Sequence, residues 1–242
     1  MAWQTPLIVR CWDSVADRAV VDGLVLFLYP DGRSGRPVQG FPNPDGTFLF
    51  HGVPELLAWQ AGSTSTGTAA YWLTVVDRDG RYLQATLSVS LPTESPLMLY
   101  LFAASTRRFP GAVAELRADL WQEETDAPAA WAVLEATEGG RTWYGIADGD
   151  GRVLLPFPFP RATGTGSPTW PVSLKVRTGA APLAGVGPLE IPPLDQILSQ
   201  PVGQIRAAPG DPVVGVLDVT LTMGGPVVLR TGTGSRLAVR SS

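Results

Sequence analysis

The sequence contains an approximate internal repeat, in which a pattern from its first third returns in its middle third. Residues 7–12 precede an acidic turn and the apolar run 20–29, and residues 115–121 precede another acidic turn and the run 128–136. Each copy is typical of a strand, a turn and a second strand. The repeat therefore predicts two similar β-rich domains in tandem.

Later parts of the two copies also correspond. Trp12 and Trp121 lie 109 residues apart, whereas Trp72 and Trp170 lie 98 residues apart. A spacing that shrinks along the chain is expected when insertions fall in loops and the strands keep their order. The small, polar segments 60–70 and 162–168 occupy matching places, and we expect both to be mobile loops.

The composition favours short strands over long helices. The 242 residues include 27 glycines and 23 prolines, about a fifth of the chain, and these residues end helices and form turns. We predict an all-β fold with a first β-sandwich over residues 1–109 and a second over residues 110–242. The second includes one short helix near residues 194–199, after two prolines.

The C-terminal part is also expected to be β structure. Residues 216–222, 227–231 and 237–240 are rich in valine and leucine, and glycine-containing turns separate them. Strands joined by such short turns commonly pair with their neighbours in sequence. We therefore predict a C-terminal β-meander.

Charge and hydropathy narrow the range of partners. The net charge is −4, from 22 acidic and 18 basic residues that are scattered along the chain, so we expect no nucleic-acid partner. Apolar runs are too short for a membrane span, and we expect no membrane partner. The first residues lack the charged start and apolar core of a secretory signal, which predicts a cytoplasmic protein.

The sequence offers little for catalysis. His51 and Cys11 are the single histidine and the single cysteine, and no nucleophile motif accompanies either of them. Cys11 lies in an apolar strand pattern and is expected in the core. The carboxylate pairs Glu123/Glu124 and Asp211/Asp218 show no sign of a shared cleft. We therefore predict no catalytic residue and no cofactor.

One acidic turn resembles a calcium loop only in part. Asp148 and Asp150 alternate with glycines, but Arg152 stands where the loop signature needs another oxygen ligand. We interpret this segment as a tight turn and predict no metal site.

Aromatic residues are the best candidates for contact with a partner. The tryptophans at matching places of the repeat are expected to pack in the two cores. A second group lies near a hairpin turn, where neighbouring strand residues face opposite ways and at least one ring should be exposed. This second group, the candidate interface, consists of Trp143, Tyr144, Phe157 and Phe159.

Three segments of the first copy carry a family resemblance. Residues 20–29, the turn and strand 44–54 (PDGTFLFHGVP) and the aromatic-led strand 71–76 resemble transthyretin-like or carboxypeptidase-regulatory-like domains. The resemblance implies tandem transthyretin-like or Ig-like β-sandwiches. Residues 55–70 depart from the pattern, because family members pass almost directly from the proline into the next strand.

The second copy resembles β-rich proteins encoded beside phage-tail-like contractile injection systems of the antifeeding-prophage type. This resemblance implies a non-enzymatic particle component that binds protein subunits and is released with an extracellular particle; it leaves open whether the component is cap, baseplate, spike or accessory piece. A carbohydrate-binding module, with a glycan as partner, is the alternative. Intradiol dioxygenases share a related sandwich, but their iron site by resemblance needs two histidines. The segments that carry the resemblance are residues 116–121, 128–135, 145–160, 170–177 and 227–231.

Overall fold

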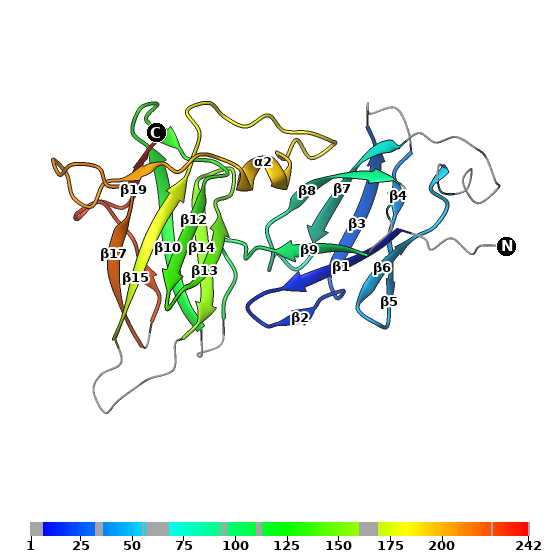
Figure 1. Cartoon of the computed structure of the whole chain (residues 1–242), viewed down its shortest axis with the longest axis horizontal. Coiled ribbons are helices and arrows are strands. Elements are labelled where there is room, and N and C mark those ends of the chain that lie inside the picture. Colours follow the sequence, from blue (N-terminus) through cyan, green and yellow to red (C-terminus); the bar gives the residue numbers. More distant parts are fainter. Residues whose placement is uncertain are drawn as a thin grey trace. The chain divides into compact units, whose positions relative to one another are not determined.

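The contacts within the chain define two compact units in the computed structural model (Figure 1). Unit 1 comprises Met1–Leu101 and Ala184–Asp195, and unit 2 comprises Phe102–Leu183 and Gln196–Ser242. The chain thus divides eight residues before the predicted boundary at residue 109, and a late segment returns to unit 1. The structure describes residues 7–31, 36–54, 56, 68–91, 93, 96–109, 113–159, 169–223 and 225–241. The predicted loops lie outside these residues, apart from 68–70.

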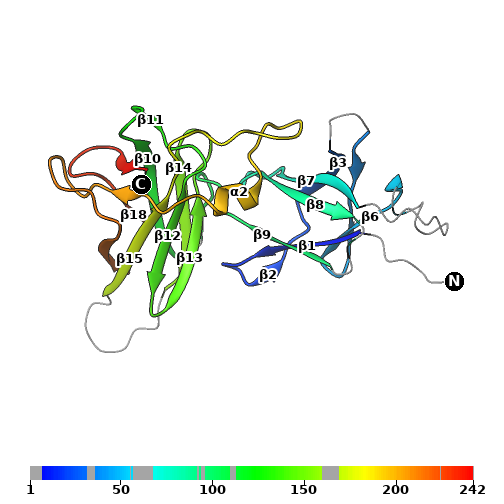
Figure 2. The same cartoon turned by 45° about the horizontal axis from the view of Figure 1, so that its top comes forward.

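The first sheet of unit 1 is built around β1, which has neighbours on both sides. β1 pairs antiparallel with β2 and β6, β6 pairs with β5, and β9 runs parallel to β1 (Figures 1 and 2). Val9 pairs with both Phe48 and Leu97, so β6 and β9 lie on opposite sides of β1. The strands are β1 (Leu7–Asp13), β2 (Arg18–Ala19), β5 (Phe41–Asn43), β6 (Thr47–Phe50) and β9 (Leu97–Leu101).

The second sheet of unit 1 is antiparallel and packs on the first through a dry core. Its order is β4-β3-β7-β8, and the core side chains of both sheets, such as Phe48, Phe50, Leu26 and Leu73, are fully buried. Burial of these apolar side chains is the main force that holds the two sheets together. The strands are β3 (Leu24–Pro30), β4 (Val38–Gln39), β7 (Ala69–Asp77) and β8 (Ala85–Leu91).

Unit 2 repeats the pairing pattern of unit 1. Its first sheet is centred on β10, with β11 and β14 antiparallel and with β18 and β19 parallel on the other side. Its second sheet has the order β13-β12-β15-β17. The strands are β10 (Val113–Gln122), β11 (Ala127–Pro128), β12 (Val133–Glu138), β13 (Arg141–Ile146), β14 (Arg152–Pro158), β15 (Thr169–Arg177), β16 (Gln204–Ile205), β17 (Leu217–Thr222), β18 (Val227–Val228) and β19 (Leu237–Arg240).

The shared topology confirms the all-β fold that the repeat predicts. In the first hairpin of each unit the repeated tryptophan pairs with the same place of the partner strand: Trp12 with Ala19, and Trp121 with Pro128. The β3–β7 and β12–β15 pairs also correspond. Two copies of one strand order, with different loops, are what an internal duplication produces.

The C-terminal strands do not form the predicted meander. β17 pairs with β15 in the second sheet, whereas β18 and β19 pair with β10 in the first sheet. The prediction was wrong because a pattern of strand, turn and strand does not say which sheet each strand joins. Residues 229–236 carry the chain from β18 to β19 along the same edge of β10.

The helix prediction is confirmed, since α2 spans Leu194–Leu198. Just before it, Pro193 bridges Thr86 of β8, which explains why this segment belongs to unit 1. Within the described residues, no helix is long and apolar enough to cross a membrane.

Candidate protein-contact surface

The four residues of the candidate interface do not form one exposed surface. Phe157 is fully buried, and the ring of Trp143 stacks on it with centroids 5.0 Å apart and planes at 26°. Phe159 packs against Trp170, with ring centroids 5.5 Å apart. Tyr144 is exposed, with 46% of its surface accessible. Only Tyr144 therefore has the exposure that a contact role needs, and that role stays a prediction.

The sheet face around Tyr144 is polar and already satisfied by its own partners. Tyr144 lies opposite Glu135, which forms an ion pair with Arg177. In the next row, the Thr137 and Thr142 hydroxyls lie 3.0 Å apart and share a hydrogen bond. Polar groups that satisfy one another leave little free energy to gain from a partner.

The repeated tryptophans correct another expectation. Trp170 is buried, but Trp12, Trp72 and Trp121 are partly exposed on the outward faces of their strands. The Trp121 indole N–H donates to the Asp126 carboxylate at 2.9 Å. The repeat thus preserves a tryptophan that packs on the outside of the hairpin turn, and strand alternation turns it away from the core.

The groups considered for catalysis lie in different surroundings. Cys11 is fully buried, and burial raises the pKa of its thiol to about 12, so the reactive thiolate is suppressed. His51 is exposed just after β6. Glu123 and Glu124 form ion pairs with Arg206 and Arg240 respectively.

The Asp148 turn holds its own carboxylate. Oδ1 of Asp148 accepts hydrogen bonds from the backbone N–H groups of Asp150 and Arg152, each at 3.0 Å. Its Oδ2 accepts from the Ser105 hydroxyl at 2.9 Å. These bonds make the segment an Asx-type turn, as interpreted from the sequence. Among the described residues, no three His, Cys, Asp or Glu side chains are grouped to hold a metal ion.

The outward face of the first sheet of unit 1 is unusually apolar. Phe41, Met98 and Tyr100 expose 57%, 42% and 54% of their surfaces. Strand register places Phe41, Leu49 and Ile8 in one row. It places Met98 beside Arg10, and Tyr100 beside Trp12. We call this surface the unit 1 outer face: Ile8, Arg10, Trp12, Phe41, Leu49, Met98 and Tyr100.

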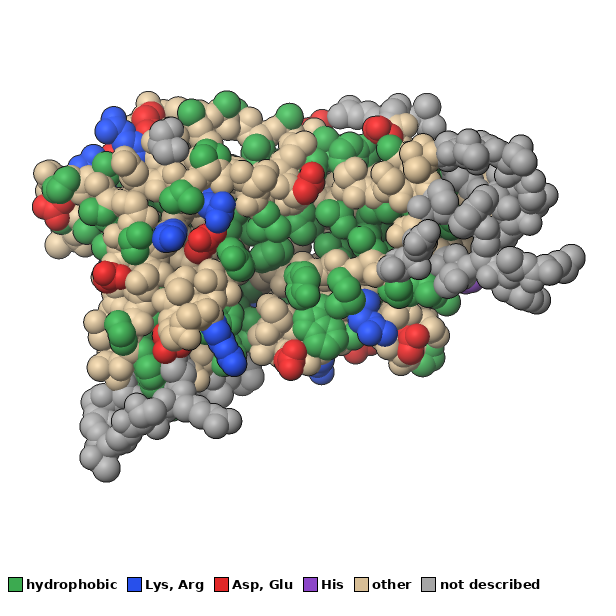
Figure 3. Space-filling view, in the orientation of Figure 1, with side chains coloured by type: hydrophobic (Ala, Val, Ile, Leu, Met, Phe, Trp, Pro, Cys, Tyr) green, Lys and Arg blue, Asp and Glu red, His purple; other side chains and the backbone are tan. Residues whose placement is uncertain are grey.

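The space-filling view shows hydrophobic side chains gathered over β1 and β9 (Figure 3). Arg10 carries the only charge among the side chains of the unit 1 outer face. Its Nε atom is buried and has no hydrogen-bond partner. The Asp45 carboxylate lies near Arg10. The pKa of Asp45 is lowered mainly by its hydrogen bond with the Thr47 hydroxyl, and the positive charge of Arg10 adds to this lowering. Arg10 is therefore a cation beside an apolar surface, and its Nε is buried without a hydrogen-bond partner.

In the part of the chain that the structure describes, the β9 edge of this sheet also has no covering strand. Within the described residues, β9 pairs with β1 alone. Its five residues, LMLYL, include neither a charged residue nor a proline, the usual protection of an exposed strand edge. The sequence analysis missed this strand, although a run that is apolar at both odd and even positions indicates a strand with two apolar faces.

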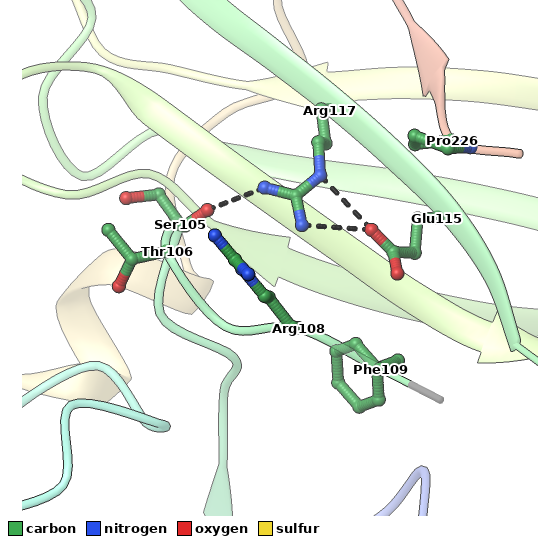
Figure 4. A pocket seen from close by; sticks show the side chains of 7 residues that line it. All are labelled: Ser105, Thr106, Arg108, Phe109, Glu115, Arg117 and Pro226. Carbon is green, nitrogen blue, oxygen red and sulfur yellow. Dashed lines mark hydrogen bonds and ion pairs between the residues drawn. The ribbon is translucent and has the colours of Figure 1, made fainter. Parts of the chain in front are cut away.

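The matching face of unit 2 is charged and covered by the chain itself. Glu115 and Arg117 point outward from β10, and their ion pair measures 2.8 Å. The Arg117 guanidinium donates to the backbone carbonyls of Ser105 (2.8 Å) and Arg107 (2.9 Å), which holds the segment of residues 102–109 at the face. Figure 4 shows Arg117 bound to Ser105 and Glu115. A pocket of about 690 Å³ lies beside this contact, lined by Ser105, Thr106, Arg108, Phe109, Glu115, Arg117 and Pro226.

Comparisons with known proteins find remote likenesses of structure only. No family model matches the chain, and no curated protein matches it. The minor pilin GBS52 of Streptococcus agalactiae is 10% identical with a TM-score of 0.27, over 99% of this chain and 97% of that one. A streptococcal ancillary pilin is 9% identical with a TM-score of 0.27, over 97% and 69%. Likenesses of this size assign neither a family nor a function.

Proposed function

We propose that this chain is a non-enzymatic structural or adaptor protein that binds other protein subunits through the unit 1 outer face. The observation that carries the proposal is the exposure of Phe41, Met98 and Tyr100 on one face of one sheet. Monomeric proteins rarely expose a contiguous apolar patch without using it. Aromatic residues, methionine and arginine are also the types enriched in protein interfaces.

The state of the reactive groups supports a role without chemistry. The Cys11 thiol is buried and held protonated, and the Asp148 carboxylate is occupied by its own turn. An adaptor needs a rigid frame and a contact surface, and the two-sheet core of unit 1 supplies the frame.

As its setting we propose a phage-tail-like contractile injection particle, with assembly in the cytoplasm before release. The support for this setting is the sequence resemblance of residues 116–121, 128–135 and 145–160 to proteins encoded with such particles. An apolar contact surface agrees with a subunit that is buried in a larger assembly.

Co-purification from cells that assemble such particles tests both parts of the proposal. The full chain should bring down sheath or baseplate subunits, and a Phe41→Ser/Tyr100→Ser variant should recover at least about tenfold less, because central aromatic contacts dominate interface affinity. Tyr144→Ser, an exposed aromatic of unit 2, is the matched control and should recover the normal amount. A chain that stays free of particle subunits overturns the setting, and equal recovery by the double variant overturns the surface.

A glycan partner is less consistent with the placement of the four predicted aromatics. Carbohydrate platforms rely on exposed rings, and of the four predicted aromatics only Tyr144 is exposed. We therefore expect tryptophan fluorescence to stay unchanged during titration with mono- and oligosaccharides. A saturable response that Tyr144→Ser abolishes would instead favour the carbohydrate-binding module.

A further inference from the structure

We propose that the β9 edge, which has no neighbour among the described residues, accepts an extended strand from a protein partner, and that this strand carries a carboxylate that binds Arg10. The inference deepens the proposed function, on which it rests, by stating the form and the charge of the docking segment.

The first step concerns the edge itself. β9 uses one side for its parallel pairing with β1, and alternate backbone N–H and C=O groups point away from that side. The outward side chains Met98 and Tyr100 stand next to that edge. A strand added there would gain backbone hydrogen bonds from the edge and apolar contacts from these two side chains.

The second step concerns the charge. Arg10 lies beside Met98, one strand from the β9 edge. Its Nε is buried without a hydrogen-bond partner, so a carboxylate on an added strand would bind the terminal amino groups of the guanidinium. Neighbouring strands are about 4.8 Å apart, so the long side chains of an arginine on β1 and of a glutamate on the added strand can meet above Met98. A carboxylate satisfies an arginine better than a neutral acceptor does.

The third step uses unit 2 as an internal template. Ile8 pairs with Leu49, and Arg117 pairs with Leu154, at matching places of the repeat. In unit 2 this place is covered by residues 102–109, whose carbonyl oxygens accept hydrogen bonds from Arg117. The matching face of unit 2 thus already holds a segment of the chain through an arginine.

A second copy of this chain fits the unit 1 outer face less well. The face carries one charge, that of Arg10, so two copies would bring two cations to one apolar interface, with only the Asp45 carboxylate of each copy near its Arg10. Like charges that lose their water are unfavourable at an interface. The occupant should instead be an acidic, apolar strand of a different protein.

Peptide selection on the immobilised full chain tests this inference. The probe is a phage-displayed library of random peptides of about ten residues, the length of a long strand. Enriched peptides should alternate apolar residues and contain aspartate or glutamate, and their binding should slow hydrogen exchange of the β9 amides. Arg10→Glu should reverse the selection toward peptides with lysine and arginine. Arg10→Gln should remove the preference for acidic peptides, so that the selected acidic peptides bind this variant about tenfold more weakly.

Matched variants separate the edge from the rest of the surface. Met98→Lys/Tyr100→Lys should abolish the selected binding, and Tyr144→Lys should leave it unchanged. Failure to enrich alternating peptides, protection elsewhere than β9, or a selection indifferent to Arg10→Glu and Arg10→Gln overturns the inference. If sedimentation shows that the protein forms dimers, and Met98→Lys dissociates them, the occupant of the face is a second copy of this chain. If co-purification with particle subunits still requires Phe41 and Tyr100, the proposed function stands even when the inference about the β9 edge fails.

Discussion

At the scale of single residues, a buried carboxylate organises one end of unit 1. The side chain of Asp77, only 1% exposed, accepts hydrogen bonds from the backbone N–H groups of Arg81 (2.6 Å) and Tyr82 (3.1 Å). The Arg81 guanidinium pairs with it at 3.0 Å and also donates to the Asp22 carbonyl. Burial alone would raise the pKa of Asp77, but the bonds from Arg81 outweigh burial and lower the pKa.

We predict that Asp77→Asn destabilises unit 1 at neutral pH by about 2 kcal/mol, the typical value of hydrogen bonds to a charged group. Because the folded pKa lies below the unfolded one, the stabilisation is complete above the ordinary pKa of about 4 and is lost as the pH falls through the folded value. Hydrogen exchange of core amides at several pH values measures the difference. A gap between the two proteins that does not narrow as the pH falls below the ordinary pKa would contradict this account.

The aromatic residues show where prediction from sequence stops at this scale. Strand alternation correctly implies that Trp143 and Tyr144 face opposite ways, and Tyr144 is exposed. Alternation does not say which of the two faces the core. Phe157 belongs to the core because the neighbouring sheet closes over it, which is a tertiary fact that no local pattern carries.

At the scale of elements, the turn that joins β13 to β14 depends on a particular glycine. Gly151 has φ of +79°, and a Cβ added there would lie 2.6 Å from the Leu120 carbonyl oxygen. Gly149, two residues earlier, would meet no atom within 4 Å. The same turn thus contains one glycine that the backbone requires and one that it does not.

We predict that Gly151→Ala destabilises unit 2 by roughly 2 kcal/mol or more, from the left-handed conformation and the close carbonyl together. Gly149→Ala, the control, should change the stability by less than about 0.5 kcal/mol. Urea denaturation of both variants makes the comparison. Equal stability of the two would show that the turn relaxes without cost.

The segment that covers unit 2 depends on Arg117. Arg117→Ala removes two hydrogen bonds to backbone carbonyls and the ion pair with Glu115, so we predict a loss of about 1–3 kcal/mol of local stability. Amides of residues 102–109 should exchange faster. Arg152→Ala, which removes an exposed ion pair with Asp150 at 3.4 Å, should leave that exchange unchanged. Unaltered exchange in Arg117→Ala would mean that packing alone holds the segment.

The strands, the helix and the repeated topology follow from local patterns and from the internal repeat. The partners of β17, β18 and β19 do not, because sheet membership depends on contacts distant in sequence. The open edge at β9 is equally invisible locally, since nothing in LMLYL says that one side lacks a neighbour. The candidate site was missed for that reason.

At the scale of the whole molecule, one duplicated topology carries two different surfaces. In unit 2 the outward face of the first sheet is charged and covered by residues 102–109. In unit 1 the matching face is apolar, with Phe41 and Tyr100 more than half exposed. The repeated topology thus supplies the same two-sheet frame twice, with an apolar outward face in unit 1 only.

Side-chain footprinting of the free protein and of the assembled particle tests the central claim most directly, because it reads the unit 1 outer face itself. We predict that Met98 and Tyr100 are labelled in the free protein and protected in the assembly, while Tyr144 is labelled in both. Met98 and Tyr100 that stay equally labelled after assembly would contradict the account.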